Sequence, residues 1–113
     1  MVERVWSART AGRDGAAAYA AYFRRVVLPE LAAVGGYRGA TLLQRDLRGG
    51  IEVVVSTRWD SLDAIRVFAG DDIERAVVHD EAAALFSDYD HTVRHFEIVI
   101  EEQRADGSGS VRL

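Results

Sequence analysis

The stretch that decides the fold runs from Tyr37 to Trp59 and reads YRGATLLQRDLRGGIEVVVSTRW. It contains two runs rich in apolar and β-branched residues, 40–43 and 51–55, which predict two strands. Gly49 and Gly50 between them predict a tight turn, because glycine adopts a positive φ at no steric cost. Successive strand side chains point to opposite faces, so the unbroken apolar runs predict a hairpin covered on both sides.

The segments around the hairpin complete an α+β pattern. Residues 3–10 predict a first strand, and residues 16–34 predict a helix with a kink or break near Pro29. After the hairpin, three short helices are expected at 62–68, 71–78 and 81–86, and a last strand at 92–100. The expected helix starts are Asp14, Asp60 or Ser61, the Asp71–Glu74 capping box, and Asp80.

This order predicts a ferredoxin-like βαββαβ fold with a four-stranded antiparallel sheet and a second helix broken into short segments. The expected domain covers residues 1–100, and the polar, glycine-rich residues 101–113 predict a flexible tail. Helices can cover only one sheet face, whereas Val53 to Val55 and Ile98 to Ile100 are apolar on both faces. We therefore expect a two-fold homodimer that packs sheet against sheet.

Composition narrows the function classes. A chain of 113 residues is large enough for one domain with its own core. The absence of cysteine excludes disulfides and thiolate chemistry, and the net charge of −4 argues against a nucleic-acid partner. No apolar run approaches the roughly 18 residues of a membrane span, and the first ten residues lack a signal-peptide core. A cytoplasmic location with no membrane partner is the expectation.

Four segments, in order, resemble a known family. They are Gly36-Tyr37-Arg38-Gly39-Ala40, Ser56-Thr57-Arg58-Trp59-Asp60-Ser61, Phe68-Ala69-Gly70-Asp71-Asp72-Ile73 with Ala76-Val77-Val78, and Tyr89-Asp90 with Val93-Arg94-His95-Phe96-Glu97-Ile98. Together they resemble the antibiotic biosynthesis monooxygenase family of dimeric α/β barrels. The resemblance covers roughly residues 2–100. It implies the same barrel, and a cleft between sheet and helices that takes a small aromatic or hydrophobic molecule.

The resemblance also implies an activity. Cofactor-free members deprotonate a phenolic or polyketide-like substrate, such as an anthrone, and its carbanion reacts directly with molecular oxygen. Haem-degrading members carry a ligating histidine in an alanine–histidine pair, and the matching pair here is Ala76-Val77. Valine does not ligate iron, and on a helix His79 would point elsewhere, so we expect no cofactor. The alternatives are a non-catalytic binder of a hydrophobic metabolite and a non-oxidative cyclase or isomerase using the same cleft.

His95 and Glu97 are the candidate catalytic pair. Two residues apart on a strand they share a face, and a carboxylate that orients an imidazole makes a general base. The alternative is that His95 is a core or interface histidine and Glu97 lies at a wet strand edge. His91 and His95 are about 13 Å apart along a strand, too far to bind one metal ion.

The candidate substrate-binding residues are mostly aromatic. An aromatic ring can stack on a flat substrate, and an inward arginine can hold a phenolate or carboxylate. The alternatives are that Trp59 pins the following helix from the core, and that arginines such as Arg58 and Arg94 serve a solvated sheet end or a dimer salt bridge. The candidates are Trp59, Tyr22, Tyr37, Phe68 and Arg38.

Overall fold

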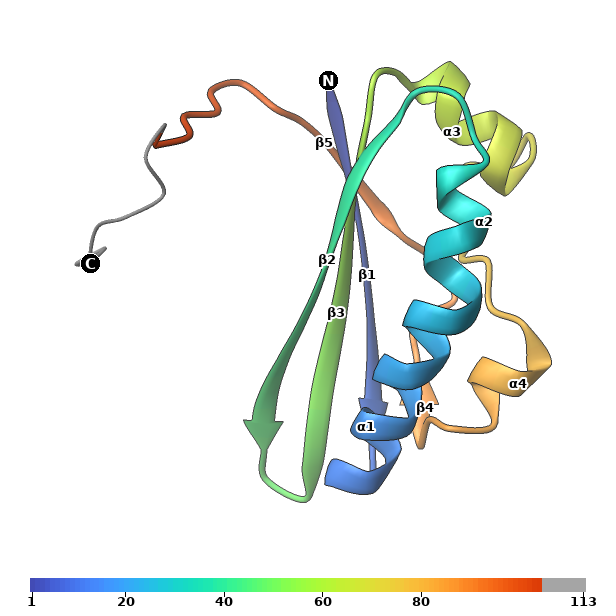
Figure 1. The fold of residues 1–113 in the computed structure, drawn as a ribbon. Helices are drawn as coiled ribbons and strands as arrows, with labels where there is room; N and C mark the ends of the chain where they lie inside the picture. The colour runs from blue at the N-terminus through green and yellow to red at the C-terminus, as the bar shows by residue number, and fades with distance from the viewer. Residues whose placement is uncertain (105–113) are drawn as a thin grey trace.

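The computed structural model describes residues 1–104 and places all helices on one face of an antiparallel sheet (Figure 1). Residues 105–113, most of the predicted tail, lie outside the described residues. The elements, in order, are β1 Val2–Thr10, α1 Arg13–Tyr22, the π-helical turn η1 Phe23–Val27, α2 Leu28–Ala32, β2 Tyr37–Leu47, β3 Gly50–Trp59, α3 Leu62–Ala69, α4 Asp80–Ala83, β4 Asp88–Tyr89 and β5 Arg94–Glu97.

The predicted hairpin is formed by β2 and β3, which are longer than the apolar runs alone suggested. Leu47 pairs with Gly50, so the connecting turn has two residues. Gly49 is the second of them, and its φ of 87° is the conformation that glycine adopts without steric cost. Leu42 lies opposite Val55, which fixes the register of the two strands.

Alternation along β3 assigns the two faces of the sheet. Ile51, Val53 and Val55 are at most 9% exposed and belong to the core beneath α1 and η1. Val54 points to the opposite face and is only partly buried. The β3 residues that face the helices are therefore the alternate ones that end in Thr57 and Trp59. The sequence alone did not show which face of the strand points to the helices.

The sheet order is β2-β3-β1-β4, with β5 also paired to β1. The single last strand predicted at 92–100 is replaced by two short strands on one edge of β1, since β4 pairs with Ala8 and Arg9 and β5 pairs with residues 2–5. Val99 and Ile100 follow β5 outside any strand and are 84% and 86% exposed. The four-stranded layout is otherwise retained, with the fourth position divided in two.

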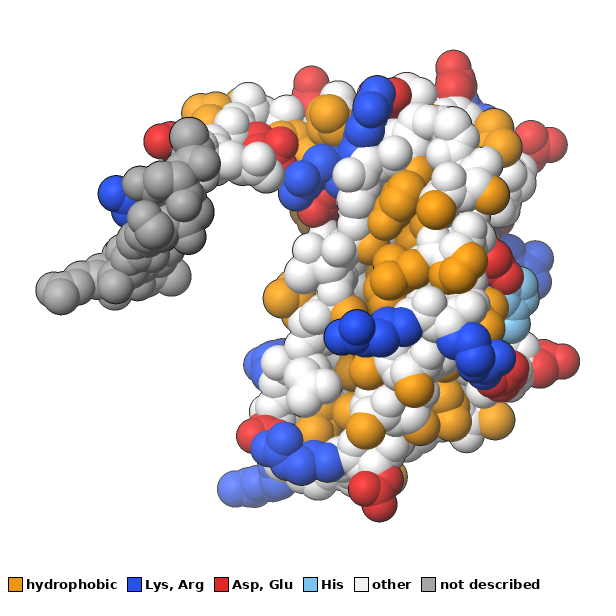
Figure 2. Space-filling view, in the orientation of Figure 1, with side chains coloured by type: hydrophobic (Ala, Val, Ile, Leu, Met, Phe, Trp, Pro, Cys, Tyr) orange, Lys and Arg blue, Asp and Glu red, His pale blue; other side chains and the backbone are white. Residues whose placement is uncertain are grey.

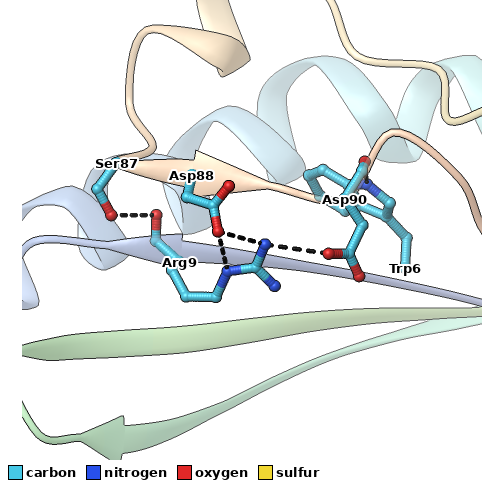
Figure 3. A network of polar contacts seen from close by, with 5 residues as sticks. All are labelled: Trp6, Arg9, Ser87, Asp88 and Asp90. Carbon is cyan, nitrogen blue, oxygen red and sulfur yellow. Dashed lines mark hydrogen bonds and ion pairs between the residues drawn. The ribbon is translucent and has the colours of Figure 1, made fainter.

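A polar network fastens β4 to β1 (Figure 3). The Arg9 guanidinium lies between two carboxylates, 2.7 Å from Asp88 Oδ2 and 3.0 Å from Asp90 Oδ1. Ser87 Oγ donates to the Arg9 carbonyl at 3.0 Å, and Trp6 Nε1 donates to the Asp90 carbonyl at 2.7 Å. The last contact fixes the Trp6 ring on the helix-facing side of the sheet.

The long helix begins at Arg13 and continues to Ala32 as α1, η1 and α2. Gly12 is its N-cap, so the expectation that Asp14 caps it was wrong; Asp14 lies in the first turn. The irregularity predicted near Pro29 is a π-helical turn, in which the Leu28 amide bonds to the Phe23 carbonyl. Proline has no amide donor and crowds the preceding turn, which accounts for the widened turn just before it.

The helix predicted at 71–78 is absent. Its backbone instead bonds to a distant segment, with the Ala76 amide donating to the His91 carbonyl at 2.9 Å and the Val93 amide to the Glu74 carbonyl at 2.8 Å. The other short helices form: Ser61 Oγ caps α3 through the Ala64 amide, and Gly70 follows its end. Asp80 begins α4, with His79 as N-cap, so Asp80 does not cap this helix.

Figure 2 shows hydrophobic side chains gathered over the helices, flanked by arginine and acidic side chains.

Within residues 1–104, no helix is long and apolar enough to cross a membrane. The expected cytoplasmic location stays a prediction.

Candidate functional site

A cavity of about 70 Å³ lies between the helix-facing side of the sheet and the helices. The sheet supplies a floor from β1 and β3, the long helix one wall, and the segment around α4 the opposite wall. Most of the lining is aliphatic or aromatic. The lining residues are Arg4, Trp6, Tyr19, Tyr22, Val27, Glu30, Leu31, Val55, Thr57, Phe68, Val77, Val78, His79, Ala82 and Val93.

Arg4 is the buried charge of this cavity. It is only 5% exposed, because the helix-facing side of β1 carries it beneath the packed layer. Nη1 donates to the Ile73 carbonyl at 2.5 Å, and Nη2 donates to the Arg75 carbonyl at 3.0 Å. No carboxylate within residues 1–104 forms an ion pair with it, and burial lowers the pKa of Arg4 to about 10. The guanidinium is therefore charged at neutral pH.

His95 lies beside Arg4 and does not line the cavity. Its Nε2 is 2.9 Å from Arg4 Nη1, a contact in which the imidazole accepts and carries its own proton on Nδ1. Burial lowers the pKa of His95, the nearby Arg4 charge lowers it further, and Glu74 opposes both. These effects keep His95 neutral at pH 7, as an acceptor that orients the guanidinium.

Glu97 lies two residues further along β5, opposite Val2, and is exposed. No hydrogen bond or ion pair joins it to His95 in the described part of the chain. Glu97 is also absent from the cavity lining. The two candidate catalytic residues thus share a sheet face, as expected, without contacting each other.

Trp59 is a core residue in this structure. It is fully buried, its Nε1 donates to Thr57 Oγ1 at 2.8 Å, and it does not line the cavity. Its ring packs between Tyr37 and Phe68, with centroids 5.6 Å and 5.7 Å away. Of the predicted aromatic residues, Phe68 and Tyr22 line the cavity, whereas Trp59 packs on Phe68 and Tyr37 packs on Trp59.

The arginines that the sequence singled out lie away from the cavity. Arg38 is exposed and pairs with Asp60, at 2.6 Å from Nε and 2.9 Å from Nη2. Arg58 lies on the open sheet face, 2.9 Å from Glu101, and Arg94 lies over the Phe96 ring there. Both Arg38 and Arg58 thus form ion pairs within the chain, and neither lines the cavity.

Two tyrosines provide neutral polar groups. Tyr19 and Tyr22 are each 4% exposed, and their rings line the cavity. Neither hydroxyl has a hydrogen-bond partner within residues 1–104. Burial raises the pKa of Tyr19 and that of Tyr22, so both hydroxyls stay protonated at neutral pH and can donate to a bound molecule.

His79 and Glu30 form a pair at the cavity wall. His79 Nε2 lies 3.3 Å from Glu30 Oε2, and both side chains are about half exposed. The sequence predicted a helix here, on which His79 would point away from the position of Val77. The segment is extended instead, so Val77 and His79, two residues apart, both line the cavity.

Arg4, His79 and Glu30 are the polar residues that sequence reasoning missed. Arg4 alternates with Trp6 and Ala8 on one face of β1, and an arginine within an apolar face was the available signal. Nothing in the local sequence pairs His79 with Glu30, because the contact joins α4 to α2 across the fold.

Comparison with known proteins shows likeness at the level of the fold. No protein-family model and no curated protein sequence matches the chain. A solved structure of a MhuD mutant, with two manganese protoporphyrin IX bound per active site, is 19% identical, with a TM-score of 0.59 over 92% of this chain and 100% of MhuD. Rv0793 from Mycobacterium tuberculosis is 21% identical, with a TM-score of 0.55 over 91% of this chain and 100% of its own. The chain therefore has the ferredoxin-like fold of MhuD and Rv0793, the fold that its resemblance to the antibiotic biosynthesis monooxygenases implied.

Proposed function

We propose that the chain is a small cofactor-independent monooxygenase that oxidises a phenolic or polyketide-like substrate with molecular oxygen. The observation that carries this proposal is a single apolar cavity in which a buried cation, two unpaired tyrosine hydroxyls and a histidine–glutamate pair converge, all within residues 1–104. Convergent polar groups in an apolar pocket are the usual form of a small-molecule site. The chain shares its fold with MhuD, a mutant of which was solved with manganese protoporphyrin IX bound in its active site.

The reaction needs a base and a dry pocket. A base removes a proton from the activated methylene group of an anthrone-like substrate, and the resulting carbanion gives its electrons to oxygen. The hydroperoxide that forms then loses water and leaves a carbonyl group in place of the methylene. One oxygen atom of the dioxygen molecule thus enters the product and the other leaves as water. The substrate is the only reductant.

His79 is the proposed base. It lines the cavity, and Glu30 is placed to orient the imidazole and stabilise its protonated form. Its partial exposure gives the accepted proton a route to solvent. His95 is assigned a different part, that of holding Arg4 in place.

A porphyrin does not fit this cavity. Pockets for drug-sized ligands hold roughly 300 to 1,000 Å³, whereas this cavity has about 70 Å³. The resemblance places Val77 where haem-degrading members have their ligating histidine, and the Nε2 atom of His79 faces Glu30. The size favours a single phenolic ring, or one ring of a larger substrate such as an anthrone with its other rings outside the enclosed space.

Oxygen consumption with anthrone tests this function. Wild-type protein is expected to accelerate oxygen uptake, and His79→Asn to lower the rate by about a hundredfold or more, as expected for loss of a general base. His91→Asn is the matched control, since His91 is exposed and contacts Tyr89 outside the cavity. No protein-dependent uptake, with melting shifts on adding anthrone, would indicate a binding module. An unchanged rate in His79→Asn would remove this residue as the base.

We also propose that two copies associate through the open sheet face. Apolar side chains of four strands lie on it: Leu43 is 52% exposed, Phe96 is 48% exposed, and Val5 and Val54 are partly buried. Leu43 and Val54 are directly opposite in the register and form an apolar pair on this face. A second copy would cover this pair and the exposed Phe96 ring, and would complete the dimeric barrel.

Leu43→Glu is expected to convert the dimer to a monomer, because it places an unpaired carboxylate beside Val54 within the proposed interface. Light scattering at micromolar concentration measures the mass directly. Val67→Glu is the control: Val67 is 76% exposed on α3, on the helical side of the molecule, and its change is expected to leave the dimer intact. A monomeric wild-type protein would contradict the proposed assembly.

A further inference from the structure

Arg4 is a buried cation with no countercharge of its own. Only 5% of it is exposed, and within residues 1–104 it has no carboxylate partner. Burying an unpaired charge is costly, and proteins ordinarily pair such a group or leave it facing a ligand. The arginine–carboxylate pairs of the described chain lie instead at the surface or on the open sheet face.

The contacts of Arg4 leave part of its guanidinium available. An arginine has five N–H donors. Nη1 contacts the Ile73 carbonyl and His95, and Nη2 contacts the Arg75 carbonyl. The Nε–H and one N–H of Nη2 therefore have no partner in the described chain. Three neutral acceptors hold the group rigid without cancelling its charge, which is the arrangement of a preorganised anion-binding group.

We propose that the cavity binds a small aromatic oxyanion, a carboxylate or a phenolate, whose charged oxygen is held by Arg4. The apolar body of the ligand would pack on Tyr22, Phe68 and Val55, and the Tyr19 hydroxyl can donate a further hydrogen bond. The proposal rests on the proposed function and adds the chemical class of its substrate. It concerns the binding step and not the oxidation. A neutral analogue of the same shape would leave the Arg4 charge uncompensated and be rejected.

The residues around Arg4 leave its charge available to bind an anion. Glu74, whose charge acts on His95, makes no ion pair with Arg4 in the described chain, and Glu30 is paired with His79 at the cavity wall. His95 is a positioning residue, because its Nε2 faces the guanidinium and not the cavity. The Arg4 guanidinium is thus the charged group that an anionic ligand would contact.

Calorimetric titration with benzoate and benzamide tests the proposal, since the two differ little in shape and fully in charge. Wild-type protein is expected to bind benzoate at least about tenfold more tightly than benzamide, about 1.4 kcal/mol. Arg4→Met, which keeps most of the chain length, is expected to lose this preference. Arg13→Met is the control, because Arg13 is exposed and pairs with Asp46 outside the cavity. Benzoate is not oxidised by this chemistry, so its binding is independent of any oxygen uptake.

A second measurement needs no variant. The 4-nitrophenolate anion absorbs visible light, and a site that favours the anion lowers the pKa of bound 4-nitrophenol. Such a shift in wild-type protein is the expected result for a phenolate site, and tight benzoate binding without it would assign the site to carboxylates. Equal binding of benzoate and benzamide, together with an unshifted 4-nitrophenol spectrum, would overturn the proposal. Intact benzoate binding without oxygen uptake from anthrone would instead reject the monooxygenase function alone.

Discussion

Replacing Trp59 by alanine is expected to lower the free energy of unfolding by about 3 to 5 kcal/mol, the range for deleting a buried large aromatic side chain. Trp59 is fully buried in a cluster with Leu31 and Ile65, and it packs against Tyr37 and Phe68. Deleting the indole would leave a cavity and remove the donor to Thr57 Oγ1. Urea denaturation followed by circular dichroism measures the change.

Val67→Ala is the control for Trp59→Ala, because Val67 is 76% exposed. It is expected to change stability by no more than about 0.5 kcal/mol. The pair also decides between the two interpretations of Trp59. If Trp59→Ala lowered the free energy of unfolding by less than about 1 kcal/mol and abolished benzoate binding, a core role would be contradicted. Trp59 would then be a ligand-binding residue.

Gly50→Ala is expected to destabilise the protein by about 2 to 3 kcal/mol, near the upper end for overpacking. A Cβ atom at this position would lie 2.3 Å from the Thr10 carbonyl oxygen. That oxygen belongs to the backbone of β1, so the clash is relieved only by moving the end of the strand away from the hairpin. Thermal or urea unfolding measures the loss.

Gly39→Ala is the matched control in the same hairpin, since a Cβ there meets no atom within 4 Å. It is expected to change stability by at most about 0.5 kcal/mol. Equal effects of the two alanine substitutions would contradict the close approach of Gly50 to β1. Gly50 thus differs from its neighbour Gly49, which is needed for its positive φ.

The hairpin was predictable because its signals are local. The apolar runs and two glycines lie within one stretch, and Ser61 and Gly70 mark both ends of α3 in the sequence. Which side chains of β3 face the helices was not predictable, because Val53, Val54 and Val55 are identical residues. What decides it is the packing of Ile51, Val53 and Val55 beneath the long helix.

The helix expected at 71–78 failed for a non-local reason. Asp71 and Glu74 have the spacing of a capping box, but Glu74 and Ala76 form backbone hydrogen bonds with Val93 and His91 instead. These two segments are close only after the sheet has formed. The same contacts carry the Ile73 and Arg75 carbonyls to Arg4 and present His79 to the cavity.

Sequence reasoning selected two of the aromatic residues that line the cavity and missed its buried charge. Tyr22 and Phe68 were selected because flat substrates stack on aromatic rings, and both line the cavity. Histidines and surface-strand arginines were weighed one at a time by local spacing. Arg4 becomes notable only when the helices bury it without a carboxylate, and burial of that kind is a tertiary property.

We propose that the cavity under the long helix is the functional site and that Arg4 holds the charged end of its ligand. A crystal structure of the protein with 4-nitrophenol bound at a pH where the free phenol is ionised tests this most directly. We expect the ring to lie between Tyr22 and Phe68, with the phenolate oxygen within hydrogen-bond distance of the Arg4 guanidinium. A ligand on the open sheet face, or one in the cavity with its nitro group toward Arg4 and its phenolate oxygen toward His79, would contradict it.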